Sequence, residues 1–168
     1  MKTLISVLIC IFLFIGCGYK PSSYYAKNAI SGDVYVELKV DISNAQNSVY
    51  VKDAMNEMVI NQLKANLTDD KMKADTIVTV ALTNVSHIAM STDDNGYVES
   101  YRTIVNIGVS YQKKNGKKKS INVSNYYDYS VDPTSIITDQ KKNIAVKIAS
   151  TKAFTDVFSK IAINNMKE

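Results

Sequence analysis

The stretch Asp33–Ile42, DVYVELKVDI, alternates strictly between polar and apolar residues, and this alternation decides the fold. One side of an extended chain carries the apolar residues, and the other side carries the residues between them. The apolar residues are Val34, Val36, Leu38, Val40 and Ile42. A period of two is typical of a β-strand with one buried face. Because the apolar face of such a strand needs a second layer to cover it, the sequence predicts a layered α/β architecture.

The segment after this strand has the period of a helix. From about Val49 to Leu67, apolar residues recur every three or four positions, with charged residues on the other side. A second strand begins at Thr76, and a change of parity near Asn84 predicts a β-bulge. A helix joins the two strands, so we expect a parallel pair with a right-handed connection. The predicted apolar face of the helix consists of Met55, Met58, Val59, Leu63 and Leu67.

Two turn signals divide the rest of the sheet into strands. The segment 93–96, DDNG, and the pair Asn115–Gly116 are typical of hairpins, and they delimit strands at 97–113 and 120–131. Asp132 and Pro133 then predict the start of a helix, as N-cap and first helical residue. The helix continues to about Asn165. Its expected buried residues repeat by sevens: Ile137, Ile144, Thr151 and Phe158, and, offset by four, Ile148, Thr155 and Ala162.

The order of elements is therefore strand, helix, strand, strand, strand, helix. We expect an α+β fold, a two-layer sandwich with two helices packed on one face of a four-stranded mixed sheet. Residues 33–168 are enough for a single domain with one core. Residues 17–32 have no regular period, and we expect them to form a tether.

The N-terminus has the features of a bacterial lipoprotein signal. Lys2 precedes an apolar run from Leu4 to Ile15, which is shorter than the roughly 20 residues that span a bilayer. Gly16 and Cys17 close the run, and FIGC at 14–17 resembles a lipobox, although Phe14 stands where the family usually has Leu. Residues 1–16 are thus expected to be a signal peptide and Cys17 the lipidated residue. The alternative is an uncleaved anchor helix.

The residues around Cys17 also bear on the compartment. Cys10 lies within the expected signal, so a disulfide in the mature chain is not expected. Gly18 follows Cys17, where an Asp would favour retention in the inner membrane of enteric bacteria. We therefore expect a lipid anchor in the outer membrane.

Composition and motifs argue against most catalytic functions. The formal charge of +4 is too mild to suggest a nucleic-acid partner. His87 is the sole histidine, and we interpret it as structural. The acidic pairs 69–70 and 93–94 fall in turns, where Asp serves backbone geometry. The sequence has no phosphate loop, nucleophile elbow or zinc spacing. We expect no enzyme activity, no cofactor and no metal site.

Tyrosines on the last strand have two interpretations. Tyr127 and Tyr129 share the parity of buried residues, so we expect them in the core. Tyr126 points the other way, and together with Tyr35 it could form an interface on the exposed face of the sheet. Ordinary cross-strand pairing explains it equally well.

Lysines flank the turn at Asn115–Gly116 and form the densest charge feature of the chain. One interpretation is a solubilising hairpin tip that fixes the strand register. The other is a tip that binds phosphate, because ammonium groups act as point charges for phosphate. The candidate residues are Lys113, Lys114, Lys117, Lys118 and Lys119.

The element order, the CGY start at 17–19 and the segments ADTIV at 74–78 and ESYR at 99–102 resemble the lipopolysaccharide-assembly lipoprotein family (LptE-like). The resemblance implies a plug in the lumen of the lipopolysaccharide-translocon β-barrel. It also implies help in assembling that barrel and binding of lipopolysaccharide through basic residues. We place that binding at the lysine tip. The long basic tip and the single arginine, Arg102, depart from the family pattern.

A second function class remains open, a periplasmic lipoprotein that activates a cell-wall synthase through protein contacts. Such a protein needs a long reach. Residues 18–32 span roughly 50 Å at most when fully extended, which favours action close to the outer membrane. Parallel pairing of the first two strands also predicts that the lysine tip lies beside the tether, with Asp93 and Asp94 at the opposite end.

Overall fold

The alternating segment forms β1, Asp33–Lys39, in the computed structural model, which describes residues 22–40, 45–131 and 137–165. Val34 and Val36 are buried, as predicted, but the prediction was wrong for Val40, which lies beyond the end of the strand and is 56% exposed. The strand ends earlier than predicted, at Lys39, and Ile42 lies outside the described residues. β1 pairs in parallel with β3, Thr76–Thr92, which confirms the expected parallel pair.

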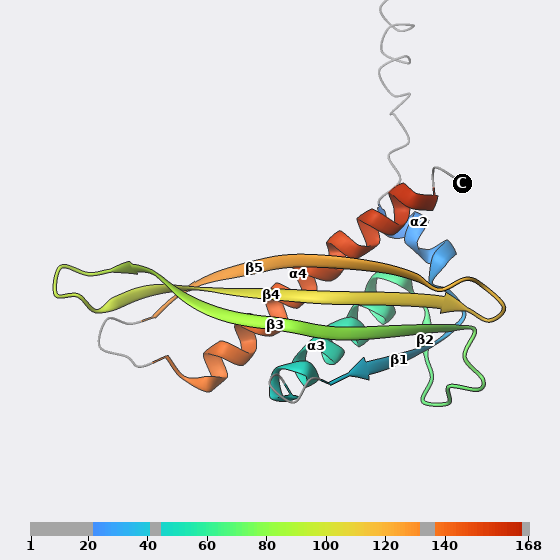
Figure 1. Cartoon of the computed structure of the whole chain (residues 1–168), viewed down its shortest axis with the longest axis horizontal. Helices are drawn as coiled ribbons and strands as arrows, with labels where there is room; N and C mark the ends of the chain where they lie inside the picture. Colours follow the sequence, from blue (N-terminus) through green and yellow to red (C-terminus); the bar gives the residue numbers. More distant parts are fainter. Residues whose placement is uncertain (1–21, 41–44, 132–136, 166–168) are drawn as a thin grey trace, which may run out of the picture.

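The strands β3, β4 and β5 form the expected antiparallel meander. β4 spans Val98–Lys113 and β5 spans Lys119–Ser130. With the short strand β2, Asn66–Leu67, the sheet order is β2-β1-β3-β4-β5. The register of β3 against β4 shifts between Leu82 and Asn84, which confirms the predicted bulge. No residue of β3 beyond this bulge is buried, and the β3–β4 hairpin extends past the helices (Figure 1). We call residues 83–102 the ribbon.

The predicted helix between the first two strands consists of two segments with different winding. The α-helix α3, Ala45–Met58, continues into a π-helical turn, η2, Val59–Leu63. Lys64 ends the helix in the left-handed conformation, with φ of 53°. The prediction was wrong for Leu67, which is exposed and forms the two-residue strand β2 with Asn66. The left-handed turn ends the helix and lets β2 pair with β1. The other predicted core residues, Met55, Met58, Val59 and Leu63, are buried.

The last helix, α4, Asp139–Asn165, begins later than predicted. Thr138 caps it, because its hydroxyl accepts the Lys141 N–H at 3.3 Å and its carbonyl accepts the Lys142 N–H at 3.1 Å. Ile137 and Thr138 are described and are not helical. The predicted start at 132–133 lies outside the described residues.

The buried face of α4 differs from the predicted seven-residue repeat. Of that set only Phe158 and Ala162 are buried, whereas Ile144 is 50% exposed and Thr155 is also exposed. The predicted seam is too narrow, since a helix that covers a sheet needs a wide apolar face with a period of 3.6. The observed face consists of Ala145, Val146, Ala149, Ser150, Ala153, Phe154, Val157, Phe158, Ile161 and Ala162.

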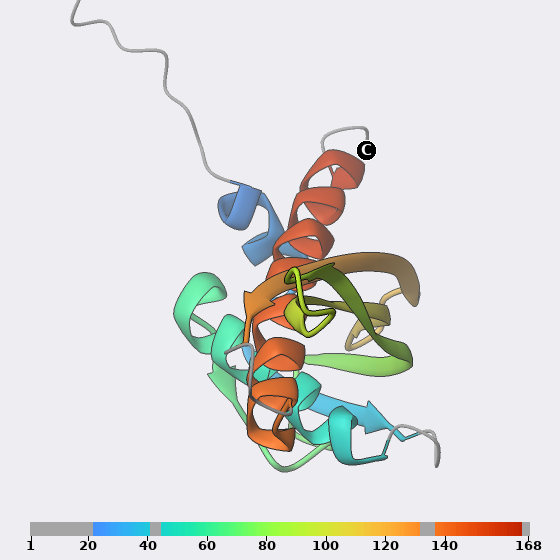
Figure 2. The ribbon, with the colours of Figure 1, turned by 90° about the vertical axis from the view of Figure 1, so that its left-hand side faces the viewer.

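The segment expected to be a tether contains a helix, α2, Ser22–Ala29. Ala26, Ala29 and Ile30 are buried, and α2 packs against η2 and the C-terminal part of α4 (Figures 1 and 2). The tether prediction was therefore wrong for residues 22–29. A helix of this length is marginal in isolation, so burial against the rest of the domain stabilises it. Its apolar face is too short to give a clear helical period in the sequence.

The helices α3 and α4 lie on one side of the curled sheet (Figure 2). The opposite face carries the exposed side chains of Asn122, Ser124 and Tyr126. This confirms the predicted α+β sandwich of two main helices on a mixed sheet, to which the short β2 adds a fifth strand. Among the described residues, no helix has both the length and the apolar character needed to cross a membrane.

The strand β5 forms one edge of the sheet, and side chains contact its outward backbone groups. Lys160 Nζ donates to the carbonyl of Asn122 at 3.0 Å, and Lys152 Nζ donates to the carbonyl of Tyr126 at 3.4 Å. The Oδ1 of Asn125 accepts the N–H of Tyr126 at 2.7 Å. Three of the backbone groups that this edge strand would otherwise present to a partner are thus occupied from within the domain.

Candidate functional site

The lysine hairpin, residues 113–119, joins β4 to β5 by a tight turn. The Gly116 N–H donates to the Lys113 carbonyl at 2.8 Å, and Gln112 Nε2 donates to the Gly116 carbonyl at 3.0 Å. Asn115 has φ of 72°, a left-handed conformation that Asn tolerates better than most residues. This confirms the predicted turn at Asn115–Gly116.

The lysine hairpin is fixed to the start of the neighbouring strands. The Lys114 N–H donates to the Asp75 carbonyl at 2.8 Å, immediately before β3. The Asp75 carboxylate in turn accepts the N–H of Asp33, the first residue of β1, at 3.0 Å. The hairpin therefore lies at the end of the sheet where β1 and β3 begin, as the parallel pairing predicts. The acidic turn at 93–96 lies at the opposite end (Figure 1).

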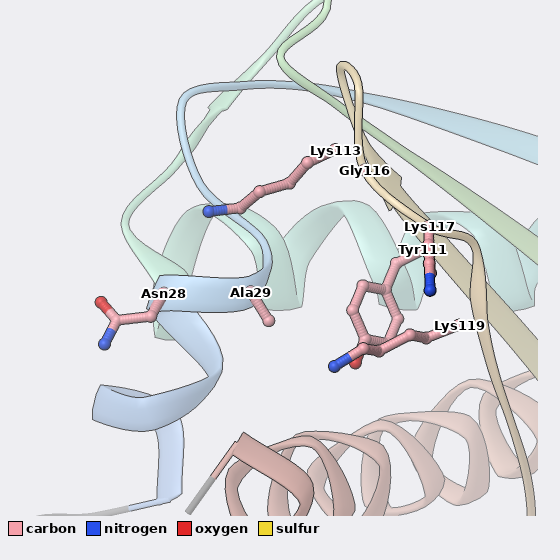
Figure 3. Close-up of a pocket in the computed structure, with 7 residues that line it drawn as sticks. All are labelled: Asn28, Ala29, Tyr111, Lys113, Gly116, Lys117 and Lys119. Atoms are coloured by element: carbon pink, nitrogen blue, oxygen red, sulfur yellow. The ribbon is translucent and has the colours of Figure 1, made fainter. Parts of the chain in front are cut away.

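A cavity of about 390 Å³ lies between α2 and the lysine hairpin. Asn28 and Ala29 of α2 form one wall, and lysines of the hairpin extend from the other side (Figure 3). The ring of Tyr111 lies beside Lys119 (Figure 3). Because lysine side chains are cationic at neutral pH, the cavity combines positive charge with apolar surface. Its full lining is Asn28, Ala29, Tyr111, Lys113, Gly116, Lys117 and Lys119.

The five predicted lysines do not form one cluster, because they lie on different sides of the hairpin. Lys113, Lys117 and Lys119 line the cavity beside α2. Lys118, which precedes the first residue of β5, instead lines a hollow of about 200 Å³ with Lys39. The Lys114 side chain is exposed.

An ion pair sets the charge beside the hollow that Lys118 lines. Lys71 Nζ donates to Glu37 Oε1 at 2.8 Å, and the Thr79 hydroxyl donates to Oε2 at 3.2 Å. The bond from Lys71 lowers the pKa of Glu37 below its usual value of 4.5, against a smaller opposing effect of burial. Glu37 therefore stays ionised at neutral pH, and Lys71 is already paired with it.

The profile of a known family, LptE: Lipopolysaccharide-assembly, matches residues 35–161. The match runs from within β1 to within α4 and covers well over half of the chain. This chain belongs to the LptE family. Membership implies a role in lipopolysaccharide assembly and anchoring at the outer membrane, and it identifies the chain as an assembly lipoprotein and not an enzyme.

Solved structures that are similar to this chain include lipoproteins. A lipoprotein from Caulobacter crescentus superposes with a TM-score of 0.52 at 6% identity, covering 88% of this chain and 97% of that one. Lipoprotein B from Nitrosomonas europaea gives a TM-score of 0.48 at 8% identity, with 89% and 94% covered. Rare lipoprotein B from Shewanella oneidensis gives 0.40 at 11%, with 80% and 91% covered. At these identities the Caulobacter likeness shows the fold alone. No curated protein matches the chain.

The remaining polar candidates have structural partners, in keeping with a non-enzymatic LptE protein. His87 Nδ1 lies 2.7 Å from the Thr103 hydroxyl. Burial lowers the pKa of His87 below 6.5, and the charge of Lys142 lowers it further. Asp70 and Asp93 accept backbone N–H groups within their own turns, as expected. Within the described ranges, no three His, Cys, Asp or Glu side chains are placed to hold a metal ion.

Arg102, the single arginine, is held in a cross-strand contact and not directed toward the cavity. Its guanidinium makes two hydrogen bonds with Asp128, each 2.7 Å long, and lies 3.9 Å from the ring centroid of Tyr126. The bonds from Arg102 lower the pKa of Asp128 below its usual value. Tyr126 is exposed, as predicted. Tyr127 and Tyr129, predicted to be core, are half-buried and stacked on each other.

Sequence reasoning missed the wall of the cavity that α2 supplies. Asn28 and Ala29 fell in the segment expected to be a tether, and Tyr111 was not among the predicted site residues. The spacing of Ala26, Ala29 and Ile30 is the one available signal, because three and four residues apart is one face of a helix.

Proposed function

We propose that this chain is the outer-membrane lipoprotein that partners and plugs the β-barrel of the lipopolysaccharide translocon, and that it binds lipopolysaccharide during assembly at the cell surface. Membership of the LptE family is the observation that carries the proposal. The matched segment includes β3, β4, β5 and most of α4, which form most of the core.

Lipidation at Cys17 is part of the proposal, although residues 1–21 lie outside the described ranges. The support is the apolar signal that ends at Gly16 and Cys17. Because α2 begins at Ser22 and packs on the core, only residues 18–21 separate Cys17 from the folded domain. The five steps from Cys17 to Ser22 span about 18 Å at most.

This short reach bears on the alternative function, activation of a cell-wall synthase. An activator anchored in the outer membrane must reach across the periplasm to such a partner. With α2 folded, the reach is well below the roughly 50 Å expected for an irregular segment from 18 to 32. The geometry favours a partner at the outer membrane itself.

The lysine hairpin is the proposed lipopolysaccharide-binding site. A solubilising tip needs no second wall, whereas here α2 faces the lysines across a cavity. Lys113, Lys117 and Lys119 can pair with phosphate groups, and Ala29 and the Tyr111 ring offer apolar surface to the same ligand. An amphiphile that carries phosphate fits this combination.

Affinity purification of the tagged full-length lipoprotein from detergent-solubilised outer membranes tests the partnership. We expect a large β-barrel protein of the lipopolysaccharide translocon to co-purify in stoichiometric amounts. Recovery of a cell-wall synthase would instead support the alternative, and recovery of free lipoprotein alone would contradict both. A Cys17→Ala chain is the control for the anchor, and intact mass of the wild type should show a lipidated Cys17.

A further inference from the structure

The two ends of the domain carry opposite charge. The end at the lysine hairpin also holds Lys27 of α2, and it has the acids Asp33 and Asp75. Asp69 and Asp70 in the nearby loop are balanced in number by Lys71 and Lys73. Lysines therefore remain in excess at this end: Lys27, Lys113, Lys114, Lys117, Lys118 and Lys119. We call it the basic end.

The acidic end is far from the basic end. β4 connects the two and is 16 residues long, which corresponds to about 50 Å of extended strand. The turn at the acidic end holds Asp93 and Asp94, and Glu99 follows near the start of β4. A domain with this charge distribution has different energies in its two orientations near a charged surface.

The chain leads to its lipid anchor from the basic end. α2 lines the same cavity as the lysine hairpin, and its first residue, Ser22, is five residues after the proposed anchor, Cys17. The span of about 18 Å that these residues can bridge holds α2 close to the bilayer surface. The acidic end can contact that surface only if the long axis of the sheet lies parallel to the membrane.

We infer that the basic end is a membrane-docking surface that binds anionic phospholipid headgroups. Before the lipoprotein joins a barrel, this contact holds the long axis of its sheet perpendicular to the membrane. This inference rests on the proposed lipid anchor at Cys17. Each lysine close to an anionic surface strengthens docking by about fivefold at moderate salt. The acidic end then points away from the membrane by about the length of the sheet, about 50 Å.

The full-length lipidated protein, reconstituted in vesicles without lipopolysaccharide, provides the test. The mature chain has no second cysteine, so a single reporter can be placed at will. Ser120→Cys near the basic end and Thr92→Cys near the acidic end are matched, since both side chains are exposed hydroxyls. Each is labelled with a fluorophore, and quenching by lipids with a spin-labelled headgroup is measured.

In vesicles with about one-third phosphatidylglycerol, we expect quenching at position 120 to be at least three times that at position 92. The difference should shrink in phosphatidylcholine alone and in high salt. Lys114→Gln with Lys117→Gln should shift the docking equilibrium about 25-fold, from fivefold per lysine. The control pair Lys52→Gln with Lys141→Gln removes the same charge elsewhere and should leave quenching unchanged.

Equal quenching at the two positions, quenching that ignores salt, or equal effects of the two lysine pairs would overturn the inference. The proposed function fails by other readouts. Lipopolysaccharide binding in detergent and co-purification of a barrel do not depend on the orientation of the free lipoprotein relative to a vesicle membrane. A mass spectrum without lipid on Cys17 would remove the anchor, and with it this inference.

Discussion

The two halves of β3 share one strand but are held in place by different means. Before the bulge, Val78, Val80 and Leu82 are buried beneath the helices, and Leu82 is only 2% exposed. In the ribbon, Ile88 is 46% exposed, and cross-strand contacts such as that of His87 with Thr103 hold the chain. The comparison teaches that this domain fixes its basic end through the core and its acidic end mainly through cross-strand pairing.

The largest expected effect is a difference in the stability lost by substitutions in the two halves of β3. Leu82→Ala should lower the free energy of unfolding by about 2–5 kcal/mol, because it opens a cavity in the core. Ile88→Ala, six residues along the same strand, should cost about 0.5 kcal/mol, because the side chain is already half in solvent. Urea denaturation of both variants measures the difference. Equal losses of unfolding free energy would show that apolar side chains of the ribbon stabilise the fold as much as those of the core.

The next effect separates the ends by ligand binding. Replacing Lys113, Lys114, Lys117, Lys118 and Lys119 with Gln should leave the fold intact and weaken lipopolysaccharide binding at least tenfold, at about 1 kcal/mol for each lysine near an anionic surface. Binding of the wild type should also weaken as salt rises. Titration with purified lipopolysaccharide at low and high salt measures both effects. Unchanged affinity would return the hairpin to a solubilising role.

Substituting the cavity lysines and Lys118 in separate variants tests which of the two hollows binds lipopolysaccharide. Because Lys113, Lys117 and Lys119 line the cavity and Lys118 does not, the triple Gln variant should account for most of the loss. Lys118→Gln is the single control in the same hairpin, because Lys118 lines a different hollow. If Lys118→Gln alone matches the triple variant, the cavity beside α2 is not the binding site.

A smaller effect concerns the acidic turn. Asp93 Oδ1 accepts the N–H groups of Asn95 at 2.9 Å and Tyr97 at 2.8 Å. Asp93→Ala should therefore cost about 1 kcal/mol of stability. The adjacent Asp94→Ala is the control and should stay within about 0.5 kcal/mol, since the side chain is exposed. Thermal unfolding measures both. A change in lipopolysaccharide affinity in either variant would contradict the assignment of binding to the basic end.

The smallest expected effect is the pH dependence of the ribbon. Burial lowers the pKa of His87 in the folded chain below 6.5. The unfolded chain then binds a proton more readily, so stability from neutral His87 is present above pH 6.5 and is lost as pH falls through the folded pKa. The free energy of unfolding should change with pH at a different slope in the wild type and in His87→Gln only below about pH 6.5. Parallel unfolding curves from pH 5 to 7.5 would contradict this.

The sequence predicts best where one local signal decides the structure. The alternation around Val36, the parity change at Asn84 and the Asn115–Gly116 turn each depend on immediate neighbours, and each is confirmed. The predicted strand starts near Thr76 and Ser120 lie within one residue of those observed.

The errors arise where tertiary contacts decide. The two-residue β2 exists only because β1 offers it a partner, and α2 only because α4 covers its apolar face. The seven-residue repeat assigned to α4 suits a partner helix, whereas this helix covers a curled sheet with a wider face that includes Ala149 and Ala153. For the site, the lysines could be picked out from the sequence, but their division between two hollows and the opposing wall at Asn28 could not.

The lysines that bind the backbone of β5 have a consequence for the lipoprotein in transit. A bare edge strand is a template on which further strands assemble, and this is how soluble domains seed aggregates. Here Lys152 and Lys160 occupy carbonyls along that template, and at the other edge β2 is only two residues long. These contacts leave fewer free backbone groups on the β5 edge for a second copy to pair with, which disfavours strand-to-strand association where copies accumulate on a membrane.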